Sequence, residues 1–158
     1  MKLPSLGPRG EGWLAIQIVL LVGVFIACFV PVLPADALRS VLVQAVGLAL
    51  FIAGSVVLAL GIRGLGDSLR ALPRPKADAK LVEDGIYGLI RNPIYAGLIL
   101  VVFGASLFRA TVAGLAVSAV LAVFFDLKAR REELWLRDKF PHYAAYAARV
   151  RRFVPGVY

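Results

Sequence analysis

The residue types that could carry out chemistry are concentrated in two segments of an otherwise apolar chain. The first segment runs from Asp84 to Tyr95, and the second is the tail that begins at Asp126. The apolar runs outside them hold almost no Asp, Glu or His, which disfavours an ion or proton path through a membrane bundle. Any binding or catalytic site must therefore be assembled from these two segments.

The tail carries two pairs of opposite charge at helical spacing. Lys128 and Glu132 are four residues apart, as are Glu133 and Arg137, so each pair shares one face of a helix expected over residues 126–139. Such pairs can belong to a binding site, or they can be surface pairs that contribute only about 0.3–0.5 kcal/mol each. The spacing alone leaves both interpretations open.

A shorter helix is expected after the break at Pro141. In it, Tyr143, Tyr146 and Arg149 fall on roughly one face. Tyrosines and arginines in this arrangement are also typical of an anchor at a membrane surface. This segment is therefore a candidate for either contact with a bound molecule or contact with lipid.

Metal and disulfide chemistry are disfavoured by the counts of cysteine and histidine. Cys28 is the only cysteine and His142 the only histidine, so a disulfide within the chain is impossible. A zinc site of the usual Cys and His type would have too few ligands. We therefore expect no metal site and assign no role to either residue.

Four apolar runs must position these segments, at about residues 13–33, 38–62, 94–107 and 110–125. The first gives ~31 Å of helix, one hydrocarbon thickness, and exceeds the apolar core of a signal peptide, so we expect it to be a retained span. The third gives only ~21 Å, which predicts a hairpin with its neighbour. We predict an all-α polytopic membrane bundle of about four transmembrane helices, with a cytoplasmic loop and an amphipathic helical tail.

A single membrane domain over residues 1–158 accommodates this layout, with two N-terminal spans in 1–62 and a loop, hairpin and tail in 63–158. Asn92 and Pro93 are expected to begin the third helix as N-cap and first helical residue. Two series of small residues predict close helix packing, either within or between chains: Gly47, Gly54 and Gly61, and Gly114, Ser118 and Ala122.

The basic residues lie almost entirely on one side of this layout. Sixteen of the eighteen lysines and arginines precede the first span, lie between spans two and three, or follow span four, and Arg39 and Arg109 are the exceptions. The positive-inside rule then predicts an integral protein of the cell (inner) membrane with both termini in the cytoplasm. Most of the formal charge of +8 is expected to set this topology and to contact anionic lipids rather than nucleic acid.

The order of motifs from about Asp67 to Pro155 resembles a known family. The block Leu81-Val82-x-x-Gly85-x-Tyr87-x-x-x-Arg91-Asn92-Pro93-x-Tyr95-x-Gly97 is followed by a hairpin, and then by Glu132-Glu133-x-x-Leu136, Phe140, Tyr143-x-x-Tyr146 and Val154-Pro155. This series is similar to that of the isoprenylcysteine carboxyl methyltransferases, which belong with the phospholipid methyltransferases. The first two spans contribute nothing to the resemblance.

The resemblance implies S-adenosylmethionine-dependent methyl transfer to a lipid-linked or apolar acceptor, such as the carboxylate of a prenylated cysteine. It implies catalytic roles for Lys128 and Arg91. The implied cofactor-binding residues are Leu81, Val82, Tyr87, Asn92, Pro93, Ile94, Tyr95 and Glu132. The implied substrate-binding residues are Lys128, Tyr143, Tyr146 and Arg149.

Two positions depart from the family pattern. Lys128 stands where the eukaryotic enzymes have an arginine that contacts the acceptor, and lysine keeps the charge but lacks the bidentate fork. Asn92 stands where histidine is usual, and an amide can hydrogen-bond but cannot titrate near neutrality. Acid–base chemistry by histidine is therefore excluded at this position.

Two other functions remain open from the sequence. Membrane sterol reductases that use NAD(P)H have a similar C-terminal hairpin and tail, although this chain has fewer spans than a typical reductase and lacks a separate G-x-G-x-x-G fingerprint. The chain could instead be a non-enzymatic membrane subunit whose tail is only an anchor. Binding of S-adenosylmethionine or of a nicotinamide cofactor would distinguish these possibilities.

Overall fold

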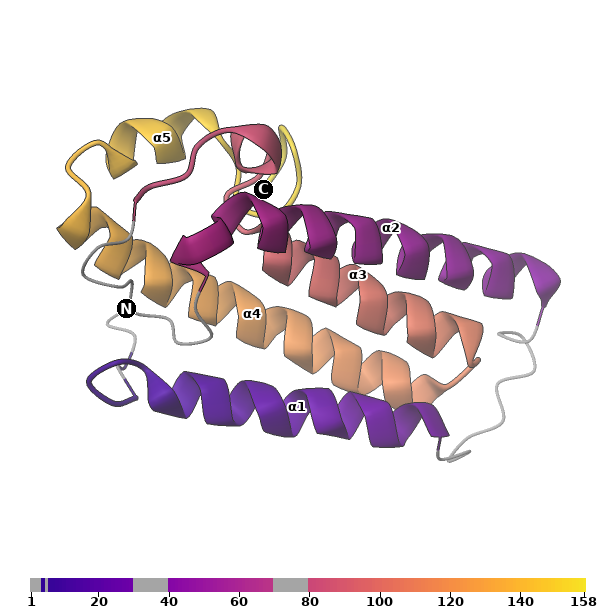
Figure 1. Cartoon of the computed structure of the whole chain (residues 1–158). Coiled ribbons are helices and arrows are strands. Elements are labelled where there is room, and N and C mark those ends of the chain that lie inside the picture. Colours follow the sequence, from indigo (N-terminus) through magenta and orange to yellow (C-terminus); the bar gives the residue numbers. More distant parts are fainter. Residues whose placement is uncertain (1–3, 5, 30–39, 70–79) are drawn as a thin grey trace.

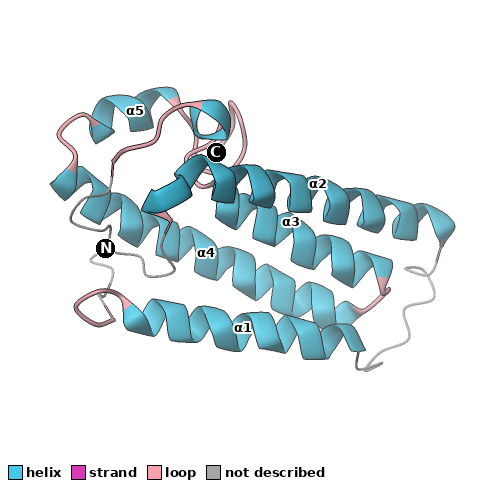
Figure 2. Ribbon diagram, in the orientation of Figure 1, coloured by secondary structure: helices cyan, strands magenta, loops and turns pink. Residues whose placement is uncertain are grey.

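The computed structural model describes residue 4 and residues 6–29, 40–69 and 80–158, and this part of the chain is helical (Figures 1 and 2). Its elements are α1 (Glu11–Phe29), α2 (Val41–Leu65), the short 3-10 helices η2 (Gly66–Ser68) and η3 (Gly85–Gly88), α3 (Pro93–Phe108), α4 (Val112–Lys139) and α5 (Tyr143–Arg149). The predicted all-α membrane bundle is confirmed.

Three helices of the described chain, α1, α2 and α4, are long and apolar enough to cross a membrane. The shorter helix α3 has 16 residues, in agreement with the short third run expected from the sequence. Figure 1 shows the four helices running side by side in alternating directions. The start of α1, the end of α2, the start of α3 and the end of α4 therefore lie at one end of the bundle, which we call the polar end.

Helix α4 joins two segments that the sequence suggested as separate helices. The fourth apolar run and the charged tail form one uninterrupted helix of 28 residues. The Thr111 side chain caps its start by accepting a hydrogen bond from the Gly114 amide, and neither Gly nor Pro interrupts the helix after Gly114. Lys128 and Glu132 therefore lie on a rigid extension of a membrane helix.

Helices α2 and α3 pack through glycines. A Cβ atom added at Gly54 would lie 2.7 Å from the Leu100 side chain, and one added at Gly97 would lie 2.6 Å from the Leu58 amide nitrogen. Gly104 faces the backbone of Phe51 at 2.5 Å in the same way. The predicted glycine series of α2 therefore serves a contact within the chain, and it allows two backbones to approach closely without a hydrophobic driving force.

Helix α1 packs mainly against α4. Trp13 and Val24 of α1 pack in a core with Leu121, Phe124 and Phe125 of α4, to which Val102 of α3 also belongs. The centroids of the Trp13 and Phe124 rings lie 5.6 Å apart. Near the opposite end of the bundle, the Thr111 hydroxyl donates to the Ala27 carbonyl at 3.0 Å. These contacts fix α1 along one side of the helix that carries Lys128 and Glu132.

Candidate active site

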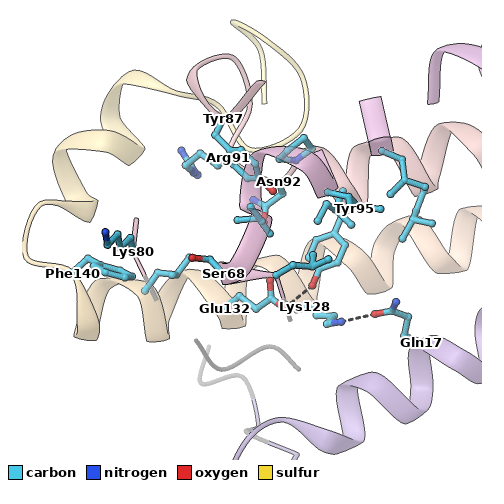
Figure 3. Close-up of a pocket in the computed structure, with 18 of the residues that line it drawn as sticks. Gln17, Ser68, Lys80, Tyr87, Arg91, Asn92, Tyr95, Lys128, Glu132 and Phe140 are labelled. Atoms are coloured by element: carbon cyan, nitrogen blue, oxygen red, sulfur yellow. Dashed lines mark hydrogen bonds between the residues drawn. The ribbon is translucent and has the colours of Figure 1, made fainter. Parts of the chain in front are cut away.

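The polar end of the bundle contains a cavity of about 510 Å³ (Figure 3). This volume is within the range of small-molecule sites in proteins. Helices α1, α2, α3 and α4, the segment between α2 and α3, and the residue that follows α4 contribute to its wall. The lining residues are Gln17, Leu21, Leu58, Ile62, Leu65, Ser68, Leu69, Lys80, Tyr87, Arg91, Asn92, Pro93, Ile94, Tyr95, Leu98, Lys128, Glu132, Leu136 and Phe140.

Glu132 is held in the wall of the cavity by a neutral donor. The Tyr95 hydroxyl, from the first turn of α3, donates a hydrogen bond of 2.5 Å to Glu132 Oε1. The Tyr95 ring is itself fixed by stacking on Phe125, with centroids 4.8 Å apart and an angle of 16° between the planes. The carboxylate is therefore oriented without being neutralised by this partner.

Lys128 lies one helical turn before Glu132 and is only 1% exposed. Its ammonium donates a hydrogen bond to the Gln17 side-chain oxygen of α1 and lies 5.1 Å from the centroid of the Tyr95 ring. The ion pairs within the described part of the chain do not include Lys128. A buried cation and a carboxylate thus lie next to each other in the cavity wall, each fixed by an uncharged group.

The loop before α3 is anchored to both its neighbours. The Tyr87 hydroxyl donates to the Gly61 carbonyl of α2 at 3.1 Å, and Tyr146 of α5 donates to the Tyr87 carbonyl at 2.7 Å. Burial raises the pKa of the Tyr87 hydroxyl well above its ordinary value, so it remains a donor at neutral pH. Tyr87 therefore orders the end of α2 beside the cavity.

Asn92 takes the N-cap position of α3, as predicted, but its side chain does not cap the helix. Its amide nitrogen lies 3.4 Å from Glu133 Oε1, and its backbone carbonyl accepts from Ala96. A cap would use the Asn92 side-chain oxygen as the acceptor for a backbone N–H, whereas here the side chain is oriented by donating from its nitrogen to a charged oxygen. The expected cap by the Asn92 side chain is therefore corrected to a contact with Glu133.

Glu133 forms the centre of a second buried cluster. Its carboxylate accepts from the Arg91 guanidinium at 3.1 Å and from two nitrogens of Arg152 at 2.9 and 3.1 Å. Arg137 is absent from the ion pairs of the described residues, so the pair that spacing suggested is replaced by partners distant in sequence. Because two guanidiniums face one carboxylate, the charge of Glu133 is fully compensated.

Arg91 lines the cavity, but most of its contacts lead to the tail. It donates to the carbonyls of Ala147, at 2.7 Å, and Val150 as well as to Glu133. The Arg91 amide also donates to the Arg151 carbonyl at 2.8 Å. Arg91 thus fastens α5 and the following segment over the polar end of the bundle.

Five of the residues expected at the site do not line the cavity. Tyr143 and Tyr146 are 1% and 2% exposed and pack in a cluster with Leu81, and burial raises the pKa of Tyr146 to about 12. Val82 is half-buried in the loop. Arg149 is exposed and pairs with Glu83 at 2.9 Å. These residues build the covering of the site, and the remaining eight expected residues are brought together in its wall.

The cavity also includes residues that the motif comparison missed. Gln17 and Leu21 come from α1, and Leu58, Ile62 and Leu65 come from α2. Gln17 had a signal in the sequence, because it is the one amide in the first apolar run. The leucines and isoleucine had none, because any apolar helix presents such residues.

Fold and site together define a class: a polytopic helical membrane protein with a cavity at one end of the bundle, where a carboxylate and an ammonium adjoin an apolar wall. The sequence model of the phospholipid methyltransferase family matches residues 42–142, which is more than half of the chain. The chain therefore belongs to the phospholipid methyltransferase family, and the resemblance inferred from the motifs is confirmed.

Curated relatives and a solved structure agree with this assignment. The chain is 31% identical over 119 residues to the probable protein-S-isoprenylcysteine O-methyltransferases of Oryza sativa subsp. indica and japonica, a match that covers 73% of this chain and 62% of each relative. It is 39% identical over 79 residues to the cobalt-zinc-cadmium resistance protein CzcN of Cupriavidus metallidurans, covering 48% of this chain and 35% of that protein.

The fold is similar to that of the eukaryotic intramembrane Ras methyltransferase ICMT (isoprenylcysteine carboxyl methyltransferase). The TM-score is 0.69 at 22% sequence identity, and the match covers 96% of this chain and 55% of that one. The chain thus spans about a third to two thirds of the length of these proteins. At this identity the likeness concerns the arrangement of helices and extends to α1, which the family match does not include.

Proposed function

We propose that this protein is an S-adenosylmethionine-dependent methyltransferase that acts on a lipid-linked or apolar acceptor at the cytoplasmic face of the membrane. The observation that carries the proposal is the cavity itself. One part of its wall presents Glu132 and Lys128, and another presents aliphatic side chains of the membrane helices α1 and α2. Family membership supplies the reaction class.

The residues of the cavity fit a sulfonium cofactor, which supplies an electrophilic methyl group when bound. The Glu132 carboxylate can bind an ammonium or ribose hydroxyls. The aromatic ring of Tyr87 suits a cation, and Tyr95 with the start of α3 at Asn92, Pro93 and Ile94 provides further wall. Leu81 supports this region from the packed cluster behind it.

The protein's own work in such a reaction is positioning and exclusion of water. Methyl transfer is an in-line displacement, so the alignment of two bound molecules supplies most of the acceleration. A carboxylate acceptor is already ionised at neutral pH, and no dedicated base is required. Arg91 contributes as a positioning residue, because it holds α5 and the tail over the polar end of the bundle.

The acceptor is proposed to be an apolar molecule with an anionic group, such as the carboxylate of a prenylated cysteine or a related small nucleophile. The names of the rice relatives specify an isoprenylcysteine acceptor. The apolar residues Leu21, Leu58 and Ile62 suit a hydrocarbon chain, and Lys128 suits an anion.

The polar end is proposed to face the cytoplasm of the cell (inner) membrane. Basic residues are concentrated in the segments that meet there, whereas Arg109 lies in the turn between α3 and α4 at the opposite end. The basic face also suits anionic lipid headgroups. Labelling of single cysteines at positions 109 and 139 by an impermeant reagent in intact cells would test this orientation, and preferential labelling at 139 would contradict it.

Calorimetry with S-adenosylmethionine tests the proposed activity directly. The purified wild type is expected to bind, and Glu132→Gln is expected to bind about tenfold more weakly because it loses one charged hydrogen bond. Glu83→Gln is the matched control, since Glu83 pairs with the exposed Arg149 outside the cavity. A folded wild type that binds NADPH but not S-adenosylmethionine would instead support a reductase.

A further inference from the structure

Helix α1 contributes one strongly polar side chain to the cavity, and it does so from an apolar span. Gln17 is flanked by Ile16 and Ile18, which are 41% and 54% exposed on the surface of the described bundle. An amide in such a helix is costly unless it has a polar partner. The partner of Gln17 is the buried ammonium of Lys128.

The type of partner determines whether the Lys128 ammonium can also bind an anion. A carboxylate partner would cancel its charge, as Glu133 does for Arg91 and as Glu133 and Asp126 together do for Arg152. Gln17 instead fixes the ammonium through a neutral oxygen, and Tyr95 contacts it through the face of a ring. Glu132, one turn along α4, acts on the ammonium electrostatically, but no ion pair between them is present among the described residues, so the ammonium is held in place with donors left for an anion in the cavity.

Gln17 also carries donors of its own. Its hydrogen bond to Lys128 uses the amide oxygen, and among the described residues no acceptor is bonded to its amide nitrogen. A lysine alone offers a point charge to a carboxylate, whereas an ammonium beside an amide N–H offers two separate donors. Gln17 can thus supply part of the two-point contact that a single lysine lacks.

We infer that Gln17 is a positioning residue which, together with Lys128, forms the contact for the anionic group of the acceptor. This inference rests on the proposed methyltransferase function. It makes α1, which lies outside the family match at residues 42–142, a determinant of acceptor choice. Leu21, one turn further along α1, lines the same cavity and extends the contact to the apolar part of the acceptor.

The experiment compares two probes that differ in one group. N-acetyl-S-farnesylcysteine carries a free carboxylate, and its carboxamide analogue is neutral. Their dissociation constants are measured by calorimetry on the full chain in detergent micelles for wild type, Gln17→Leu and Gln17→Glu. Val19→Leu is the control, because Val19 is on the same helix but 69% exposed on the outer surface.

The wild type is expected to bind the carboxylate at least about tenfold more tightly than the carboxamide, as one charged hydrogen bond would give. Gln17→Leu should reduce this ratio several-fold, and Gln17→Glu should abolish it by neutralising Lys128. Val19→Leu should leave it unchanged. The ratio is measured within each variant, and a variant that fails to fold is recognised because it also loses binding of S-adenosylmethionine.

An unchanged ratio in Gln17→Leu and Gln17→Glu would overturn the inference, and so would a wild type that does not discriminate between the probes. Binding of S-adenosylmethionine to the same samples is measured separately. If the wild type fails to bind the cofactor, the proposed function fails. If it binds the cofactor and all variants keep the same probe ratio, only the role of Gln17 fails.

Discussion

Glu132 and Glu133 are neighbours in sequence but belong to two different electrostatic environments. Glu133 is compensated by Arg91, which also donates to backbone carbonyls of the tail, and by Arg152, which also pairs with Asp126. Glu132 faces the cavity, where Tyr95 donates one neutral hydrogen bond to it. We call Glu133 with Arg91 and Arg152 the closed cluster. We call Glu132 with Lys128 the open pair.

Two adjacent residues of α4 therefore have different roles: Glu133 belongs to the packing of the fold, and Glu132 faces the site. A buried carboxylate with charged partners is costly to remove from the fold and has no remaining capacity for a ligand. A carboxyl group and an amine held by uncharged groups contribute less to the fold, yet they keep hydrogen-bonding capacity for bound molecules. Substitutions in the two groups should therefore affect stability and binding differently.

The largest effect is expected for Glu133→Ala. Removing this carboxylate leaves the side chains of Arg91 and Arg152, 9% and 16% exposed, without their central partner. Breaking a buried pair in this way typically costs about 3–5 kcal/mol. Thermal unfolding in detergent should show a large loss of stability, and limited proteolysis should cut near α5.

Glu83→Ala provides the matched control for this change. Glu83 also pairs with an arginine, Arg149, but the side chain of Arg149 is 70% exposed. Exposed pairs contribute about 0–1 kcal/mol. If both variants lose the same stability, the closed cluster is not the stabilising element that its geometry implies.

The opposite pattern is expected for Glu132→Gln. The amide can still accept from Tyr95, so the free energy of unfolding should change by less than about 1 kcal/mol. Affinity for S-adenosylmethionine should nevertheless fall about tenfold, because the charge that faces the cavity is lost. A large loss of stability with intact binding would reverse the roles assigned to the two glutamates.

The sequence predicted the elements well because their signals are local. Apolar runs, the Asn92-Pro93 start and the break at Pro141 depend on neighbouring residues, and the structure has α3 and α5 where these signals placed them. The spacing of Glu133 and Arg137 is equally local, but it pointed to the wrong partner. The true partners, Arg91 and Arg152, are brought to Glu133 only by the packing of the tail.

The site was predicted in part for the same reason. Family motifs identified Tyr95, Lys128 and Glu132, all of which line the cavity. Gln17 could be seen as a lone amide in an apolar run, but its partner lies 111 residues away and is set by how α1 packs on α4. Tyr143 and Tyr146 were expected at the substrate, whereas their burial places them in the packing beneath α5.

The smallest effect is expected for Tyr146, which joins α5 to the loop before α3. Its hydroxyl donates to the Tyr87 carbonyl, and burial raises its pKa to about 12 from an ordinary value of 10.0. The folded state therefore favours the protonated form. This contribution to stability is complete below pH 10 and is lost as the pH rises from 10 toward 12.

Tyr146→Phe should accordingly lower stability by about 1 kcal/mol at neutral pH, the usual net contribution of one hydrogen bond. Above pH 10, the midpoint of thermal unfolding should fall less steeply with pH in the variant than in the wild type. Buried Tyr87 and Tyr143 also have raised pKa values and keep part of the slope. Identical slopes in both proteins would mean that the hydroxyl of Tyr146 is ionised as readily in the folded chain as in the unfolded one, which its hydrogen bond and burial argue against.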